Sequence, residues 1–203
     1  MIRNTFKLFA LLTSSFIFSQ TGTTSPYSYA GLGDVNFRGT HVNRFMGGLE
    51  IYNDSIHANL SNPSSYAKLK LTNYTLGLNY RINNMIGANE TKSIASAGLN
   101  YIGVAMPTKY FGFGFGIIPY TSVGYKLSYI DNVNDNENIL NLFEGEGGIN
   151  KTFLSIGFTT LKFLSLGVTL NYNFGKIRYE TGRFQDEVTL GTVLENISSI
   201  SGF

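Results

Sequence analysis

Apolar and polar residues alternate with a period of two along most of the chain after Lys68. Between Leu71 and Ile82, one parity holds Tyr and Leu, while the other holds Asn, Thr and Gly. This period is typical of a β-strand with two different faces. It predicts an all-β, antiparallel fold with long strands at Leu71–Ile82, Ile94–Met106, Tyr110–Ile130, around Leu154–Phe158 and at Phe163–Phe174, and a possible sixth at Glu187–Leu194.

The predicted strands have the length and composition of membrane strands. Phe163–Phe174 covers 12 residues, whereas soluble strands average about 5–6 residues and membrane strands need about 9–11. The polar face is almost uncharged, and aromatic residues stand near the end of the apolar face at Tyr172 and Phe174. A soluble β-sandwich or a secreted adhesin domain also alternates, but these features favour a transmembrane outer-membrane β-barrel. We expect one set of side chains to face lipid, namely Tyr74, Leu76, Leu78, Leu164, Leu166, Val168 and Leu170, and another to face the lumen, namely Thr75, Gly77, Thr169 and Asn171.

Pro119 interrupts one of the predicted strands. The expected connections alternate between long and short, as in outer-membrane barrels, only if Tyr110–Ile130 counts as one strand. These connections are Arg81–Lys92 and Asp131–Gly148 (long), and Pro107–Lys109 and Leu161–Lys162 (short). The apolar parity also continues across Pro119. Because proline removes one donor from the ladder, we expect a single kinked strand; two strands joined by a turn at Pro119–Ser122 are the alternative.

The chain begins with the layout of a secretory signal peptide. Arg3 and Lys7 precede an apolar stretch, Leu8–Phe18, and the small residue Ser19 stands at the expected cleavage point. That stretch is too short to span a bilayer as a helix, which takes about 20 residues. We therefore expect residues 1–19 to be removed on export and the protein to reach the outer membrane.

Residues 20–67 alternate poorly and contain several glycines and both histidines. We expect this segment to form a hatch that plugs the barrel, while residues 68–203 form part of the barrel wall. The motif Asn62-Pro63-Ser64 should then lie at the periplasmic rim, where the plug joins the first strand. An N-terminal segment that extends away from the sheet would contradict this arrangement.

Composition excludes several functions. Without Arg3 and Lys7, 13 basic residues balance 13 acidic ones, which argues against a nucleic-acid partner. The chain has no cysteine, and neither His41 nor His57 has a spaced partner ligand, so we expect no metal and no cofactor. Nucleotide-binding, zinc-protease and serine-hydrolase motifs are missing from the sequence, and we expect no enzyme activity.

The order of these features resembles the FadL-type outer-membrane transporters of hydrophobic molecules. The resemblance rests on the signal peptide, the glycine-rich segment, Asn62-Pro63-Ser64 and the alternating first strand, and it covers Ser25 to about Lys176. Ser25-Pro26-Tyr27-Ser28 with Gly31-Leu32-Gly33-Asp34, and the run Glu144–Asn150, resemble versions from Bacteroidetes-type bacteria. The family motif is Asn-Pro-Ala, so Ser64 departs from it.

The resemblance implies a fourteen-stranded barrel with a hatch in its lumen and a kink in its third strand that opens a lateral exit into the membrane. The expected function is passive uptake of hydrophobic, fatty-acid-like small molecules. The ligand or gate residues would be Gly112, Gly114, Gly116, Pro119 and Tyr120. The glycines would leave room for a ligand or for the plug; close packing against the N-terminal segment is the other interpretation.

A second hypothesis makes the chain a structural barrel, serving as a scaffold for a protein-secretion or surface-attachment partner whose identity the sequence does not give. On either hypothesis, membrane lipid is a partner. Because closure takes at least eight strands, we expect the chain to be an N-terminal fragment that stops at Phe203; a complete eight-stranded barrel is the alternative.

Overall fold

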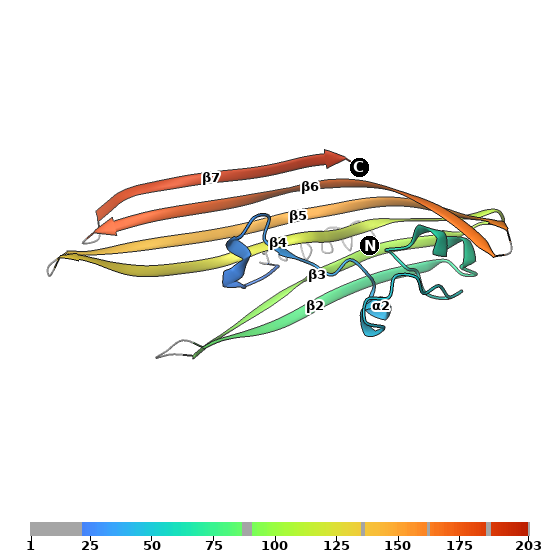
Figure 1. Cartoon of the computed structure of the whole chain (residues 1–203), viewed down its shortest axis with the longest axis horizontal. Helices are drawn as coiled ribbons and strands as arrows, with labels where there is room; N and C mark the ends of the chain where they lie inside the picture. The colour runs from blue at the N-terminus through green and yellow to red at the C-terminus, as the bar shows by residue number, and fades with distance from the viewer. Residues whose placement is uncertain (1–21, 87–90, 135–136, 162, 186–187, 203) are drawn as a thin grey trace, which may run out of the picture.

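A computed structural model describes residues 22–86, 91–134, 137–161, 163–185 and 188–202. Short elements come first, and six long strands follow (Figure 1). The short elements are the 3₁₀ helix η1 (Pro26–Tyr29), strand β1 (Asp34–Val35), helix α2 (His41–Phe45) and the 3₁₀ helix η2 (Pro63–Lys68). The long strands are β2 (Asn73–Ile86), β3 (Thr91–Pro107), β4 (Phe111–Asn134), β5 (Glu137–Leu161), β6 (Leu164–Gln185) and β7 (Val188–Gly202).

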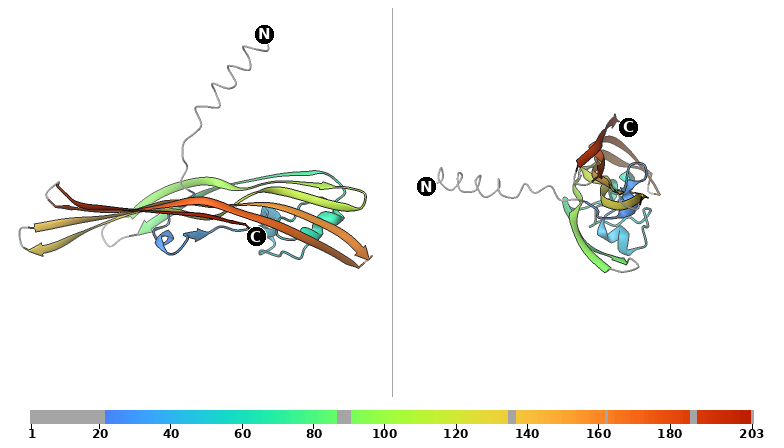
Figure 2. Two further views of the ribbon diagram at one scale, coloured as in Figure 1. Left: turned by 90° about the horizontal axis from the view of Figure 1, so that it is seen from above. Right: turned by 90° about the vertical axis from the view of Figure 1, so that its left-hand side faces the viewer.

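The long strands form one antiparallel sheet in the order β2-β3-β4-β5-β6-β7, and β1 pairs with β4. This confirms the all-β antiparallel fold. Across the described residues the sheet is open, with β2 and β7 at its edges, so closure into a barrel and a plug that fills a lumen stay predictions. The sheet curves, and the N-terminal elements lie on its concave face (Figure 2). Within the described residues no helix is long and apolar enough to cross a membrane.

The strands are longer than expected, and the connections are shorter. The predicted long loop Asp131–Gly148 was wrong, because β5 already begins at Glu137. Its acidic and glycine-rich composition suits a strand at this place for two reasons. Gly145 faces the ring of Tyr125, which fills the position of a side chain. Glu144 forms an ion pair with Lys126 of β4 across the other face, with 3.2 Å between the nitrogen and oxygen atoms.

The predicted connection Arg81–Lys92 was also mostly wrong, since β2 continues to Ile86 and β3 starts at Thr91. The possible sixth strand is confirmed as β7, although it extends further, to Gly202. The alternation of long and short loops is therefore not a feature of this sheet, and long hairpins take the place of the long loops.

β4 is one strand with a β-bulge, which confirms the kinked single strand. Its pairing with β5 shifts from Pro119↔Asn150 to Thr121↔Ile149, so Tyr120 has no partner there. One extra residue exchanges the two faces of everything that follows. Odd-numbered residues such as Phe115 are exposed before the bulge, whereas Val123 is fully buried after it. The apolar parity of the sequence thus continues across Pro119, but it changes face.

In the half of the sheet that contains Tyr74–Leu78 and Leu164–Leu170, here called the lower sheet, the two faces agree with the sequence pattern. The residues expected to face lipid are exposed, from 40% at Leu164 to 78% at Tyr74. The opposite parity is less exposed: Gly77 is buried beneath the Tyr101 ring of β3, and Thr75, Thr169 and Asn171 are half-buried. Three small hydrophobic clusters form on the concave side, around Tyr66, around Phe153 and around Val123.

Deleting Tyr120 should leave the fold intact, because the residues on both sides of the bulge then keep their present faces in a regular strand. The deletion removes the hydrogen bond between Asn36 and Tyr120, the packing of the Tyr120 ring beside Val123 and the contacts of that ring with Arg38, of which the cation–π pair contributes about 0.5–1 kcal/mol. Deleting Leu127 is the matched control, since it reverses the faces of the residues that follow it in β4. Refolding the full-length protein into bilayers, followed by electrophoresis with and without heating, measures the folded fraction. Equal folding of both deletions would contradict the role of the bulge.

Candidate functional site

A row of glycines on the concave face holds the N-terminal segment. Gly112 pairs with Gly157 across β4 and β5, and Gly157 pairs with Gly167 across β5 and β6. A Cβ atom at any of the three would collide with backbone atoms of η2, at Tyr66, Pro63 and Ser64 respectively. The missing side chains therefore let η2 lie directly on three strands.

Tyr66 anchors η2 to this row. Its side chain is fully buried, in a cluster with Ala58, Leu69 and Ala105. A Cβ at Gly114 would lie 2.8 Å from the Tyr66 ring. The ring thus occupies the space that the glycines of β4 leave, and the close-packing interpretation of these glycines is confirmed. Burial raises the pKa of the Tyr66 hydroxyl, and within the described residues this hydroxyl forms no hydrogen bond.

The motif Asn62-Pro63-Ser64 begins η2 and lies near the connection between β5 and β6. The Asn62 Oδ1 atom accepts hydrogen bonds from the Ser64 backbone N–H (3.1 Å) and from the Ser64 hydroxyl (2.7 Å). Pro63 stands at the start of the helix, where its missing N–H costs nothing. Ser64 therefore adds a hydrogen bond that alanine at this position lacks.

Gly116, Pro119 and Tyr120 also pack within the protein. A Cβ at Gly116 would collide with the Ile102 carbonyl oxygen of β3. The Tyr120 carbonyl oxygen accepts a hydrogen bond from the Asn36 N–H at 3.0 Å. Arg38 lies over the Tyr120 ring, 4.8 Å from its centroid, and donates to its hydroxyl at 2.9 Å. The bulge thus presents Tyr120 to the N-terminal segment.

The sheet splits between β3 and β4 beyond these contacts. The two strands pair only from Pro107↔Gly112 to Ile102↔Ile117, and then they diverge (Figure 1). β1 takes the place of β3 beside β4, where Asp34 pairs with Ser122 and Val35 with Thr121. The Asn83 side chain of β2 donates to the Thr24 hydroxyl at 2.9 Å. The N-terminal segment therefore bridges the two parts of the sheet.

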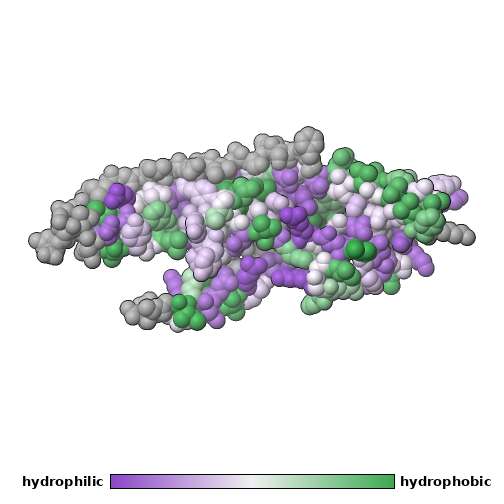
Figure 3. All heavy atoms as spheres, in the orientation of Figure 1, coloured by the Kyte–Doolittle hydropathy of each residue, from purple (hydrophilic) through white to green (hydrophobic). Residues whose placement is uncertain are grey.

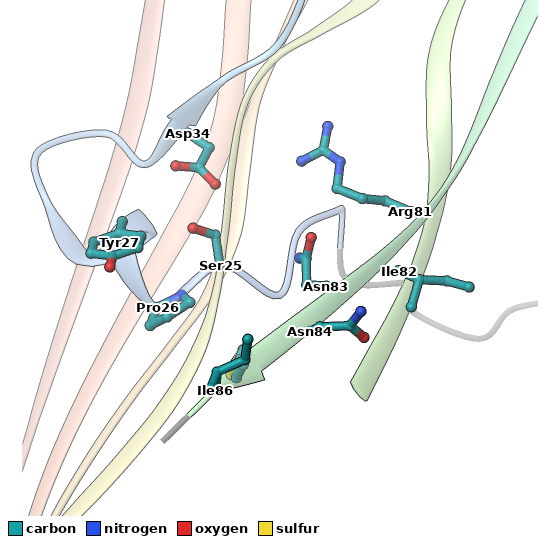
Figure 4. A pocket seen from close by; sticks show the side chains of 10 residues that line it. Ser25, Pro26, Tyr27, Asp34, Arg81, Ile82, Asn83, Asn84 and Ile86 are labelled. Atoms are coloured by element: carbon teal, nitrogen blue, oxygen red, sulfur yellow. The ribbon is translucent and has the colours of Figure 1, made fainter. Parts of the chain in front are cut away.

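A pocket of about 560 Å³ lies in this split. Ser25, Pro26, Tyr27 and Asp34 line it on one side, and the end of β2, from Arg81 to Ile86, lines it on the other (Figure 4). The Asp34 carboxylate accepts a hydrogen bond from the Thr23 hydroxyl at 3.1 Å. Within the described residues, no ion pair joins Arg81 to an acidic group. The lining is mixed, because Pro26, Tyr27, Ile82, Met85 and Ile86 stand beside the charged and polar residues.

The half of the sheet that contains Lys176–Glu180 is here called the upper sheet. On its convex face, charged residues follow the apolar ones. The same parity of β6 that holds Leu164, Leu166 and Val168 continues as Lys176, Arg178 and Glu180. An ion pair joins Arg178 and Glu146 at 4.0 Å. On the opposite face, which Figure 3 shows, hydrophobic residues gather most densely near the end that carries the connections at residues 108–110 and 162–163.

Each histidine contacts a neighbouring side chain. The His41 N–H donates to the Tyr101 hydroxyl at 3.1 Å, and His57 Nδ1 lies 2.6 Å from the Asp54 carboxylate. Burial raises the pKa of Asp54, but hydrogen bonds from His57 and Ile56 outweigh it and hold that pKa below its usual value. The described residues contain no group of three potential ligands.

Sequence reasoning missed the split and the charged upper sheet. The alternation of Lys176, Arg178 and Glu180 was a usable signal, because it continues the parity of Phe163–Phe174 without a break. The split between β3 and β4 had no such signal in the sequence, since it depends on which strands form hydrogen bonds with each other.

The chain matches one family model, BamG, over residues 1–203. BamG is a family of the outer-membrane protein assembly (BAM) complex, which implies association with the outer membrane and a protein partner. No curated protein matches the chain. No solved structure matches it either.

The family match corrects two expectations. The assignment to the FadL-type transporters was wrong, and so was passive uptake of hydrophobic molecules through a lateral exit. The motifs behind that assignment are local: Asn62-Pro63-Ser64 is helix-capping chemistry, and the glycines near it accommodate Tyr66. The predicted signal peptide, residues 1–19, lies outside the described residues.

Gly157→Ala should loosen the N-terminal segment, because its Cβ would collide with the Pro63 carbonyl oxygen. Overpacking of this kind costs about 1–3 kcal/mol. Thr159→Ala is the matched control, since Thr159 lies exposed on the same face of β5 and the change adds no volume. Limited trypsin digestion at Lys68 and Lys70 should be faster in Gly157→Ala than in the control. Equal digestion rates would show that η2 does not depend on the glycine row.

Proposed function

The chain belongs to the BamG family, and from that premise we propose that it is a structural subunit of the outer-membrane protein assembly complex. Its lower sheet stands in the membrane as a wall, and its upper sheet rises above the membrane as a platform for a protein partner. This proposal keeps the scaffold hypothesis of the sequence analysis and names the class of partner, which is another subunit of the assembly complex.

The observation that carries the proposal is the change along the convex face of β6. That face is apolar from Leu164 to Phe174 and then carries Lys176, Arg178 and Glu180. Eleven residues rise roughly 36 Å along a strand. At a tilt of about 40° they cross about 28 Å, close to the apolar band of outer-membrane barrels.

Aromatic residues mark both ends of this apolar zone, as membrane interfaces favour. Phe111 and Phe158 pair near the short connections, and Tyr172 stacks on Phe174 at the other end, with 6.1 Å between ring centroids. β4, β5 and β6 contain 24, 25 and 22 residues, about twice what a membrane strand needs. Half of each strand is therefore free to serve a purpose outside the lipid.

The packing of the concave face supports a rigid scaffold. Tyr66 fills the room beside the glycines of β4, and Phe153 packs with Leu60, Tyr101 and Ile118. A transport route along this face would have to displace a buried core. A fixed N-terminal segment instead holds the upper strands at a set position above the membrane.

Purification of the tagged full-length protein from outer membranes tests the proposal. We expect the other subunits of the assembly complex to co-purify with it, and depletion of the protein to lower the amounts of other outer-membrane barrel proteins. Intact levels of those proteins, together with the absence of complex subunits from the purified sample, would refute the proposed function.

Val168→Arg tests the membrane zone directly, because Val168 lies near the middle of Leu164–Phe174 on the exposed face. Arginine near the bilayer midplane should destabilise the folded protein by about 2–4 kcal/mol. Glu180→Arg introduces the same side chain on the same face of β6 but above the apolar zone, and surface changes of that kind usually stay within about 0.5 kcal/mol. Unfolding of both variants in lipid bilayers measures the difference. Equal stabilities would place Val168 outside the membrane.

A further inference from the structure

We propose that the upper edge of β4, at Lys126–Ile130, binds an extended segment of another subunit of the complex as an added β-strand. This inference rests on the proposed function and names the binding surface within it. An exposed strand edge offers a row of N–H and C=O groups that pair with a second chain.

The protein already uses this edge once. β1 pairs with β4 in antiparallel register, with Asp34 opposite Ser122 and Val35 opposite Thr121. The Asn36 N–H then binds the Tyr120 carbonyl oxygen at 3.0 Å. The edge therefore accepts a strand in the fold itself, directly below the part that we propose is a binding site.

The alternation of backbone groups identifies which residues face the split. The Gly124 N–H donates to the Ser28 hydroxyl at 3.1 Å, so it points away from β5. Because backbone groups in an antiparallel strand point to alternate sides, Lys126, Ser128 and Ile130 also point their N–H and C=O groups away from β5. In the part of the chain that the structure describes, no strand pairs with this stretch of the edge.

The N-terminal segment leaves this stretch open. From Val35 the chain runs towards Tyr120, away from Lys126. In the other direction it passes Ser28 at Gly124 and reaches Thr24, which binds Asn83 of β2 on the far side of the split. The described part of the N-terminal segment is therefore not the occupant, and the proposal assigns this stretch to a segment of another subunit.

The surroundings define the chemistry of that segment. On the convex face, Lys126 forms an ion pair with Glu144, and Ile130 is exposed farther along the strand. The proposed function places this edge outside the lipid, where unpaired backbone groups are tolerated until a partner arrives. On the concave face, Tyr129 stacks on Phe143 at 5.9 Å between ring centroids, and Leu127 pairs with Phe143 across β4 and β5. The expected partner segment alternates apolar and polar residues with a period of two.

Edges that must stay free of partners carry a proline, a bulge or charged side chains, lysine above all. The stretch Ser122–Asp131 has no proline, and its pairing with β5 is regular throughout. It does carry Lys126, whose side chain forms an ion pair with Glu144 of β5, so the backbone groups of Ser128 and Ile130 stay available for pairing.

Ser128→Pro in the tagged full-length protein tests the inference. Proline removes the N–H that faces the split and places its ring there, while the pairing of β4 with β5 stays intact. Ser128→Ala is the matched control, because it keeps the N–H. We expect co-purified subunits to fall at least tenfold with Ser128→Pro and to stay at the parent level with Ser128→Ala, with equal amounts of folded protein in the membrane.

A photo-crosslinking residue in place of Ile130 in the otherwise unchanged protein provides a second measurement, which does not depend on how Ser128→Pro folds. The expected adduct joins it to an alternating apolar–polar segment of another complex subunit. Adducts only with lipid, or only with residues 1–21 of the same chain, would overturn the inference. If the parent co-purifies with the complex but Ser128→Pro does so equally well, the edge is not the binding surface and the proposed function still stands; if the parent itself fails to co-purify, the proposed function fails.

Discussion

The contact between η2 and the glycine row is the constraint on which the arrangement of the N-terminal segment depends. Gly112, Gly157 and Gly167 stand side by side on three strands, and their missing side chains let the backbone near Pro63 lie against the sheet. Tyr66 then becomes the most deeply buried large side chain of the segment. With η2 fixed at the lower end, the segment reaches upward to β1, where it pairs with β4.

The bulge at Tyr120 is the second feature that positions the N-terminal segment on the sheet. It changes the face of the apolar parity in β4, so that Phe115 lies outside while Val123 packs inside against Ile149 and Ile177. It also directs Tyr120 towards Arg38 and Asn36. One extra residue thus ends the membrane-like zone of β4 and starts the upper zone, at the level where β3 leaves and β1 arrives.

The corrected identity shows how local chemistry can mislead a family assignment. Any sheet that packs against an inner segment can need the same local features. These are a 3₁₀ helix capped by Asn-Pro-Ser, glycines in a strand and a kink at a proline. The site residues chosen from the sequence do meet the N-terminal segment or β3, but as packing partners. The surfaces that suit a protein partner, the charged upper strands and the free edge of β4, lie elsewhere.

The sequence by itself determined the strands and their faces. A period of two specifies which side chains share a face, so Tyr74, Leu76 and Leu166 were correctly predicted to be exposed, and Pro119 was correctly placed inside a single strand. Tertiary structure decided the rest. Whether Glu144–Gly148 forms a loop or a strand depends on Tyr125 and Lys126 of a neighbouring strand. The split between β3 and β4 depends on backbone pairing, which carries no side-chain signature, because every residue except proline offers the same N–H and C=O groups.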